Sequence, residues 1–185
     1  MKKWTLQLIT LFLLAISVSL ASCNDADYEE YEGGDGKPAT SLEGTSWQLI
    51  EQGVKIVPTD DAPSDYKTTT GTINKFFADR LKIETAIQTF DKYSYEVTYS
   101  VNGEDIAYER YSYTLANDSI TQNDGFTTED EKGVALVAGN ILTLRVNITS
   151  SKLTAILMDS SIDPNLNDAH VKEIIYQIRG KKISE

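Results

Sequence analysis

The sequence predicts an all-β domain in which antiparallel strands close into a barrel or a sandwich. Three features support this prediction: apolar and polar residues alternate along short segments, turn dipeptides separate these segments, and the segments are numerous. About eight to ten strands fit between residue 42 and residue 185. Because an open sheet of that size would expose its edges, closure is expected.

The clearest strand runs from Tyr93 to Val101, where tyrosine and valine alternate with polar residues. Asn102-Gly103 follows at once, and both positions tolerate the positive φ of a tight hairpin. The return strand is expected over Asp105–Leu115. Its apolar phase slips between Tyr108 and Tyr111, which predicts a β-bulge there.

The other elements follow from the same patterns. A short helix is predicted near 72–81, where it would bury Phe76 and Phe77. The segment Val171–Arg179 fits either a helix or a strand, and its β-branched residues favour a strand. Gly125–Gly133 and Asp159–Asp168 are expected to be polar loops. Further strands are predicted at Ser46–Glu51, Ile83–Phe90, Ser119–Gln122 after an Asn117-Asp118 turn, Leu142–Ile148, and Leu153–Met158 after a turn at Ser150–Lys152.

Residues 1–22 have the features of an export signal. Lys2 and Lys3 give a positive start, and a mainly apolar run of fifteen residues follows from Leu6 to Leu20. This run is shorter than the ~20 residues that a membrane-spanning helix needs, and no charged stop-transfer segment follows it. The run ends in Leu20-Ala21-Ser22-Cys23, which resembles the lipobox of bacterial lipoproteins.

The lipobox resemblance implies cleavage between Ser22 and Cys23 and attachment of lipid to Cys23, with palmitate or similar acyl chains. Cys23 is the only cysteine, so it cannot form a disulfide within the chain. Each buried CH₂ group contributes about 0.8 kcal/mol, so two or three acyl chains anchor a protein stably. The membrane is therefore an expected partner, contacted through the lipid anchor alone, in a bacterial outer-membrane location.

Residues 23–41 are expected to form a flexible tether. Six acidic residues lie between Asn24 and Ser41, together with three glycines and few apolar groups. Acidic residues soon after a lipidated cysteine resemble the surface-export signals of lipoproteins in some Gram-negative gut commensals. The protein is thus expected to be either surface-exposed or on the periplasmic face.

The net charge argues against nucleic-acid binding. The chain carries a formal charge of -11, and removing a signal that contains only Lys2 and Lys3 as charged residues would give -13. Such a surface repels phosphate backbones.

Residues 42–185 would form the folded domain. It opens with Leu42-Glu43-Gly44-Thr45-Ser46-Trp47-Gln48-Leu49, which resembles the Gly-x-Trp start of lipocalin-like domains with one residue more between the two. This resemblance implies an up-and-down barrel. The META or HslJ-like domains begin with a similar Gly-Thr-x-Trp run and are the competing match. Candidate core or ligand-lining residues are Trp47, Tyr93, Tyr95 and Tyr99.

No catalytic constellation, cofactor or metal site is predicted. His170 is the only histidine, and it lies in a polar segment where an exposed or capping role is expected. With one histidine and one cysteine, Cys/His zinc sites are excluded. The acidic runs Asp60-Asp61 and Glu129–Glu131 are expected to be solvated. Asp118-Ser119-Ile120 matches a short O-glycosylation pattern, which makes Ser119 a candidate for modification.

The expected function is a non-catalytic, lipid-anchored one in the cell envelope, with a small apolar or glycan ligand in the barrel. The alternative is a structural or interaction protein with a packed barrel and no ligand. A hydrolase ranks last. A large internal pocket would favour the first hypothesis, and a filled interior with an exposed apolar patch would favour the second.

Replacing Cys23 with serine should abolish acyl labelling, because the thioether to the lipid needs the thiol. The variant should also leave the membrane fraction, as judged by fractionation after labelling with radioactive palmitate. A Cys23→Ser variant that still incorporates palmitate would show that the lipobox interpretation is wrong.

Overall fold

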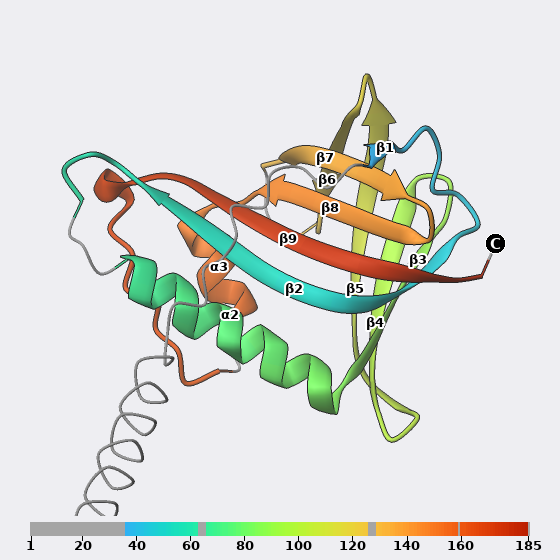
Figure 1. The fold of residues 1–185 in the computed structure, drawn as a ribbon, viewed down its shortest axis with the longest axis horizontal. Coiled ribbons are helices and arrows are strands. Elements are labelled where there is room, and N and C mark those ends of the chain that lie inside the picture. Colours follow the sequence, from blue (N-terminus) through green and yellow to red (C-terminus); the bar gives the residue numbers. More distant parts are fainter. Residues whose placement is uncertain (1–35, 63–65, 126–128, 159, 185) are drawn as a thin grey trace, which may run out of the picture. The chain divides into compact units, whose positions relative to one another are not determined.

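The computed structural model describes residues 36–62, 66–125, 129–158 and 160–184. The predicted signal and Cys23 lie outside these residues. Eight antiparallel strands form a closed barrel in which each strand pairs with its chain neighbours and the last pairs with the first (Figure 1). The predicted all-β, up-and-down barrel is therefore confirmed. Its strands are β2 (Ser46–Pro58), β3 (Thr85–Phe90), β4 (Ser94–Val101), β5 (Glu104–Ala116), β6 (Ser119–Asn123), β7 (Glu131–Ala138), β8 (Ile141–Asn147) and β9 (Val171–Ser184).

A short additional strand, β1 (Lys37–Pro38), pairs with β7 outside the ring of eight. The backbone N–H of Ala39 also donates to the carbonyl of Ala135 at 2.8 Å. The last residues of the expected tether therefore belong to the folded domain, which corrects the boundary predicted at residue 41. Few side chains are buried in this segment, so composition alone gave no sign of the pairing.

The turns predicted at Asn102-Gly103 and Asn117-Asp118 are confirmed. Asn102 and Gly103 have φ values of 53° and 84°, and the connection from β5 to β6 has φ values of 48° at Asn117 and 67° at Asp118. The bulge prediction was wrong in position. Tyr99 pairs with Ala107 and the next residue pairs with Asp105, so the extra residue is Ile106. Tyr108 is exposed on the outer face. Counting it among the core-facing residues therefore placed the bulge at the wrong position.

The barrel is closed by β9, which pairs with β2 along most of its length and with β8 on its other side. The predicted strand at 171–179 is confirmed and continues to Ser184. Trp47 is buried where these strands meet, and its indole N–H donates to the Thr45 hydroxyl at 2.8 Å. Gly180 of β9 allows Trp47 to pack closely against that strand, because a Cβ at position 180 would lie 2.8 Å from the Cβ of Trp47.

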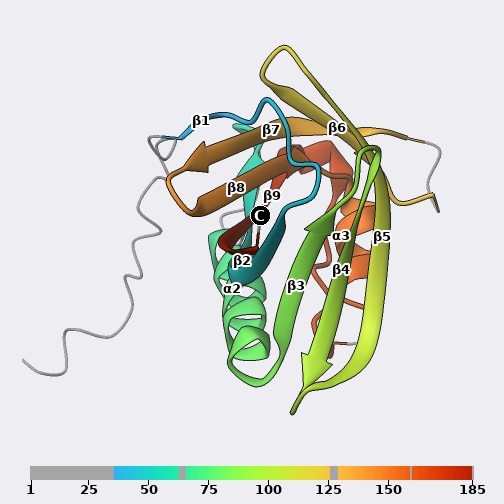
Figure 2. The same ribbon diagram turned by 90° about the vertical axis from the view of Figure 1, so that its right-hand side faces the viewer.

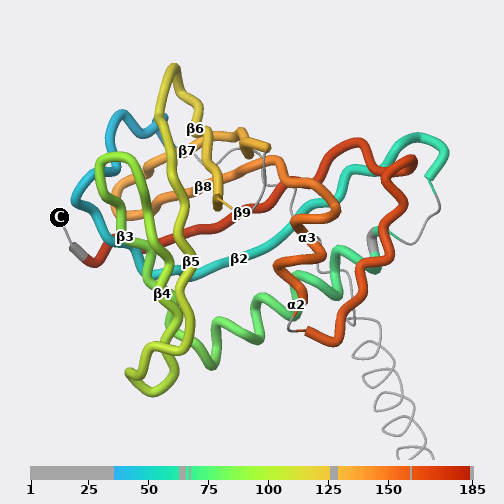
Figure 3. The backbone as a smooth tube through the Cα atoms, turned by 180° about the vertical axis from the view of Figure 1, so that it is seen from behind, coloured from blue at the N-terminus to red at the C-terminus, as the bar shows by residue number. Residues whose placement is uncertain are grey.

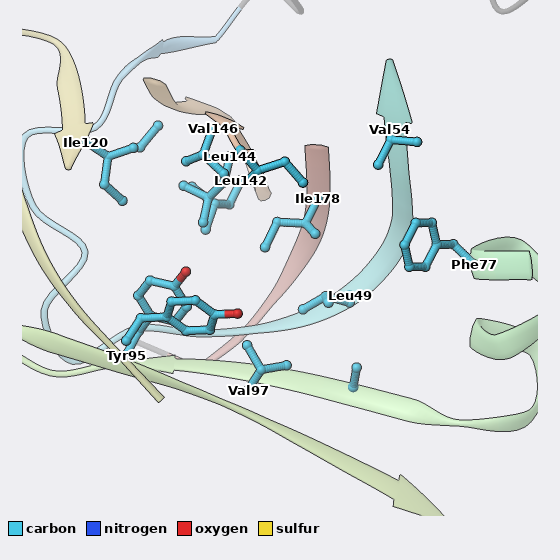
Figure 4. Packing of buried hydrophobic residues seen from close by; sticks show 14 of the residues in the cluster. Leu49, Val54, Phe77, Tyr95, Val97, Ile120, Leu142, Leu144, Val146 and Ile178 are labelled. Carbon is cyan, nitrogen blue, oxygen red and sulfur yellow. The ribbon is translucent and has the colours of Figure 1, made fainter. Parts of the chain in front are cut away.

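The helix α2 (Tyr66–Ile83) covers the barrel where β2 and β3 separate (Figure 1). The helix predicted near 72–81 is confirmed and is longer than expected. Only Ser46–Gln48 of β2 pair with β3. Farther along β2, the Asn74 side chain accepts from the Val54 N–H at 2.7 Å and donates to its carbonyl at 3.0 Å, as a neighbouring strand would. Phe77 of α2 points toward Val54 (Figure 4).

The predicted strand Leu153–Met158 is wrong, because Ser150–Ile156 forms the helix α3 (Figures 2 and 3). The Thr149 hydroxyl accepts from the Lys152 N–H at 3.1 Å and caps the helix. Leu153 and Leu157 are buried at helical spacing. The predicted partner strand, β8, pairs with β7 and β9 instead.

The interior of the barrel is lined from several strands. Leu142, Leu144 and Val146 of β8 face Leu49 and Val97 across it, with Ile178 and Tyr95 completing the enclosure (Figure 4). The strand β7, which contributes Ala135 to this core, was not predicted, and its first three residues fell in the loop expected at Gly125–Gly133.

Gly133 and Gly71 offer a matched test of the fold. A Cβ at Gly133 in β7 would lie 1.7 Å from the carbonyl oxygen of Arg145 in β8, so Gly133→Ala should lower the free energy of unfolding by about 3 kcal/mol or more. Gly71 is exposed within α2 and has open space around it, so Gly71→Ala should raise stability by about 0.5–1 kcal/mol. Urea unfolding measures both. Equal effects of the two substitutions would contradict the β7–β8 pairing.

Candidate functional site

A group of polar side chains lies inside the barrel around one small cavity. The cavity has a volume of about 20 Å³, which is room for roughly one water molecule. Four tyrosines line it together with apolar side chains of β8 and β9. We call the polar group the tyrosine–carboxylate cluster; it comprises Gln52, Tyr95, Tyr99, Glu109, Tyr111, Gln122, Glu131, Lys152 and Tyr176.

One side of the cluster is a chain of hydrogen bonds that ends at a buried carboxylate. The Tyr95 hydroxyl donates to Gln122 Oε1 at 2.7 Å, and Gln122 Nε2 donates to Glu131 Oε2 at 2.7 Å. Lys152 Nζ lies 3.8 Å from the other carboxylate oxygen of Glu131 and forms an ion pair with Asp124. Since Lys152 belongs to α3, these contacts fasten the helix to β7 and to the segment after β6.

The other side of the cluster is centred on β2 and the start of β5. Gln52 Nε2 donates to the Tyr176 hydroxyl at 2.6 Å, while Gln52 Oε1 is buried without a partner among the described residues. The Tyr111 hydroxyl donates to Glu109 Oε2 at 3.0 Å. The Tyr111 ring stacks on Tyr95, with 4.8 Å between centroids.

Two cations lie against the tyrosine rings. The guanidinium carbon of Arg80 is 4.4 Å from the centroid of the Tyr99 ring, and Lys152 Nζ is 5.2 Å from that of Tyr111. Arg80 also forms an ion pair with Glu84, at 2.6 Å. Such cation–π contacts stabilise more strongly when the charge is partly removed from water, so α2 and α3 each bind the barrel through one basic side chain.

Burial keeps the cluster's phenols neutral. It raises the pKa of Tyr95, Tyr99, Tyr111 and Tyr176, and the negative charge of Glu109 raises each of them further. Burial likewise raises the pKa of the Glu131 carboxyl, against the opposing effects of Gln122 and Lys152. The cluster can therefore donate and accept hydrogen bonds at neutral pH, while its tyrosines do not act as bases.

The residues singled out from the sequence are only partly brought together. Tyr95 and Tyr99 line the cavity, whereas Trp47 is buried at the β2–β9 contact. The candidate Tyr93 is 66% exposed before the start of β4 and lies outside the interior, which corrects its assignment. Ser119 is exposed at the start of β6, and its hydroxyl donates to the Ala116 carbonyl. Ser22 and Cys23 lie outside the described residues.

Several cluster residues were missed from the sequence. Glu131 falls in an acidic run that was expected to be solvated, but it begins β7 and is buried. Lys152 was placed in a turn. Three other cluster residues lie on or beside predicted strands: Gln52, Gln122 and Tyr176. Alternation of apolar and polar residues, however, marks an inward-facing position only where that residue is apolar. A buried glutamine therefore carries no signal of its own.

His170 lies apart from the cluster, at the end of the short 3₁₀ helix η1 (Asp168–His170). Its Nδ1 is 3.9 Å from Asp61 Oδ1, and the backbone carbonyl of His170 accepts from the Thr59 N–H at 3.0 Å. These contacts join the end of β2 to the start of β9. The arrangement is that of a structural connection between two strands.

The outer face of the β4–β5 hairpin forms a second feature. Ile106 and Tyr108 are 54% and 74% exposed, and they border a hollow of about 320 Å³ with Glu96, Thr98 and Asp105. Every residue from Glu104 to Arg110 is exposed. Among the described residues, no strand pairs with this half of β5 on the side away from β4, because β6 pairs only with 112–116. The hairpin thus presents apolar side chains beside an open strand edge.

Comparison of the chain with protein-family models, curated proteins and solved structures found no match. Within the described ranges, no helix is both long and apolar enough to cross a membrane. Nor do those residues bring three or more His, Cys, Asp or Glu side chains together as a metal ion would require.

Glu131→Gln tests the electrostatics of the cluster. With its raised pKa, native Glu131 holds its proton at pH values where the unfolded carboxyl, near 4.5, has lost it. Unfolding then releases a proton, so this group's contribution to the free energy of unfolding falls as pH rises above 4.5 through the folded pKa. Glutamine cannot titrate, and the variant should gain stability relative to the wild type over that range.

Urea unfolding from about pH 4 to pH 8 measures this difference. Glu104→Gln, at an exposed position on the β4–β5 hairpin, controls for the loss of one negative charge. If the free energy of unfolding of both variants changes with pH as that of the wild type does, the pKa of the Glu131 carboxyl is not raised in the native state.

Proposed function

We propose that this protein is a lipid-anchored protein of the bacterial outer membrane that works without catalysis, as an interaction protein with a packed barrel. The observation that carries the proposal is the filled interior, where the cavity has only about 20 Å³. Ligand pockets for small molecules are typically about 300–1,000 Å³. The resemblance of Leu20-Ala21-Ser22-Cys23 to a lipobox and the acidic residues that follow support the location.

The surface of the hairpin supports the same proposal. Ile106 and Tyr108 expose apolar area beside a hollow, whereas the interior offers none to a ligand. Exposed apolar side chains rimmed by polar ones are typical of sites where another protein binds. The rim here includes Glu96 and Asp105.

Binding of a small apolar or glycan ligand is the alternative. It is favoured by the number of polar groups that converge inside the barrel, since hydrogen-bonding groups and aromatic rings suit a sugar. It would require α3 to move outward, because Lys152 and Ile156 of this helix line the cavity. A hydrolase needs two carboxylates with space for substrate, whereas Glu109 and Glu131 border a cavity of water size and are engaged by Tyr111 and Gln122.

Methyl NMR should distinguish the packed barrel from the ligand barrel. Fatty acids, sterol-like molecules and oligosaccharides, titrated one at a time, should leave the methyl signals of Val97, Leu144 and Val146 unchanged, because these side chains line a cavity too small for them. Ile73, a buried residue of α2 outside the cavity lining, serves as the reference methyl. A saturable shift of the three cavity methyls, with Ile73 unmoved, would reject the packed barrel and favour the ligand alternative.

Photo-crosslinking in cells should locate the interaction surface. A photoreactive phenylalanine analogue at Tyr108 should form a discrete crosslink to an envelope protein, and this crosslink should disappear with Ile106→Ser. The same analogue at Lys75, which is exposed on α2, should not form it. Identical crosslinks from both positions, or none from Tyr108, would contradict the assignment of this surface.

A further inference from the structure

We propose that the barrel cavity is a preformed site for one hydrogen-bond-donating guest with a single heavy atom, either water or an ammonium ion. This inference concerns the interior and does not depend on the outer surface assigned above. It rests on one buried acceptor that lacks a donor, on the groups around it and on the size of the cavity.

The acceptor is Gln52 Oε1. Gln52 is 4% exposed and lines the cavity from β2. Its Nε2 donates to the Tyr176 hydroxyl at 2.6 Å, and its Oε1 has no hydrogen-bond partner among the described residues. Buried polar atoms in folded proteins are almost always hydrogen-bonded, to the protein or to an ordered water. A guest that donates to Oε1 completes the site.

The surrounding groups favour a donor over an anion or an apolar guest. The carboxyl groups of Glu109 and Glu131 both border the cavity, and each offers an oxygen that can accept a hydrogen bond. The rings of Tyr95 and Tyr111 stack on each other beside it, and aromatic faces attract cations and N–H or O–H groups. The Tyr176 hydroxyl accepts from Gln52 and keeps its own proton to donate, which a water molecule could accept.

The volume limits the guest to one heavy atom. About 20 Å³ exceeds the roughly 10–15 Å³ that a water molecule needs by this measure, and it leaves no room for a second. An ammonium ion is of similar size. Water and ammonium share the ability to donate to Gln52 Oε1, and they differ in charge and in the ability to accept from Tyr176.

The test compares the wild type with a variant in which the cavity is filled. Val146→Ile adds a methylene at a residue that lines the cavity, and Val97→Ile does the same from the opposite strand. Val54→Ile is the matched control, because Val54 is buried outside the cavity lining. Water ¹⁷O relaxation dispersion counts long-lived internal waters. Thermal unfolding in ammonium chloride and in sodium chloride at equal ionic strength detects ammonium.

If water is the guest, the wild type should have one more long-lived internal water than Val146→Ile and Val97→Ile, and Val54→Ile should match the wild type. Both cavity variants should also unfold about 2–4 °C lower, since the acceptor is left without a donor. If ammonium is the guest, ammonium chloride should raise the unfolding temperature of the wild type saturably, and Val146→Ile should lose this rise.

A dry cavity would overturn the proposal. In that case neither cavity variant would change the count of internal waters, and ammonium would stabilise no more than sodium. Filling the cavity would then raise the unfolding temperature of Val146→Ile or Val97→Ile, because the added methylene gains contacts and displaces nothing.

Discussion

The pairing of β2 with β9 is the constraint on which the rest of the structure depends. These strands are the first and last of the barrel, and their register extends from Ser46 paired with Ser184 to Pro58 paired with Val171. Joining the ends of so long a segment costs conformational entropy. The contact of Trp47 with Gly180 and the burial of apolar side chains from both strands offset that cost. Without closure, the tyrosine–carboxylate cluster would have no opposite wall, and the buried carboxyl group of Glu131 would be solvated.

Closure leaves two places where neighbouring strands separate, and a helix lies at each. Where β2 parts from β3, α2 provides Asn74 to satisfy the backbone of Val54. Where β5 extends beyond β6, α3 is fastened by Lys152 to the carboxylates of Asp124 and Glu131. Beside β2, α2 therefore completes the wall, whereas the edge of β5 from Glu104 to Arg110 is paired with no strand other than β4 among the described residues. Burying Lys152, Asp124 and Glu131 costs solvation free energy, and the ion pairs between them offset part of that cost.

The sequence predicted those parts of the fold whose signals are local. Asn102-Gly103 and Asn117-Asp118 place two of the tight hairpins because these residues tolerate positive φ. Elements that depend on distant partners were missed. Leu153 and Leu157 suit a short helix as well as a strand, and the choice is made by the Thr149 cap and by Lys152 reaching carboxylates far away in sequence. For the same reason the cluster could be predicted only at Tyr95 and Tyr99, which lie on the most regular strand.

Native-state hydrogen exchange tests the closure most directly. If β2–β9 pairing holds the barrel together, the backbone amides of Gly53 and Gln177, which pair with each other in this register, should exchange only through global unfolding, with the same denaturant dependence as Val97 in β4. The three amides should then report one common free energy, equal to that from urea unfolding. Exchange at Gly53 and Gln177 through a separate opening of lower free energy, while Val97 stays protected, would contradict the account, because the barrel would then persist without its β2–β9 pairing.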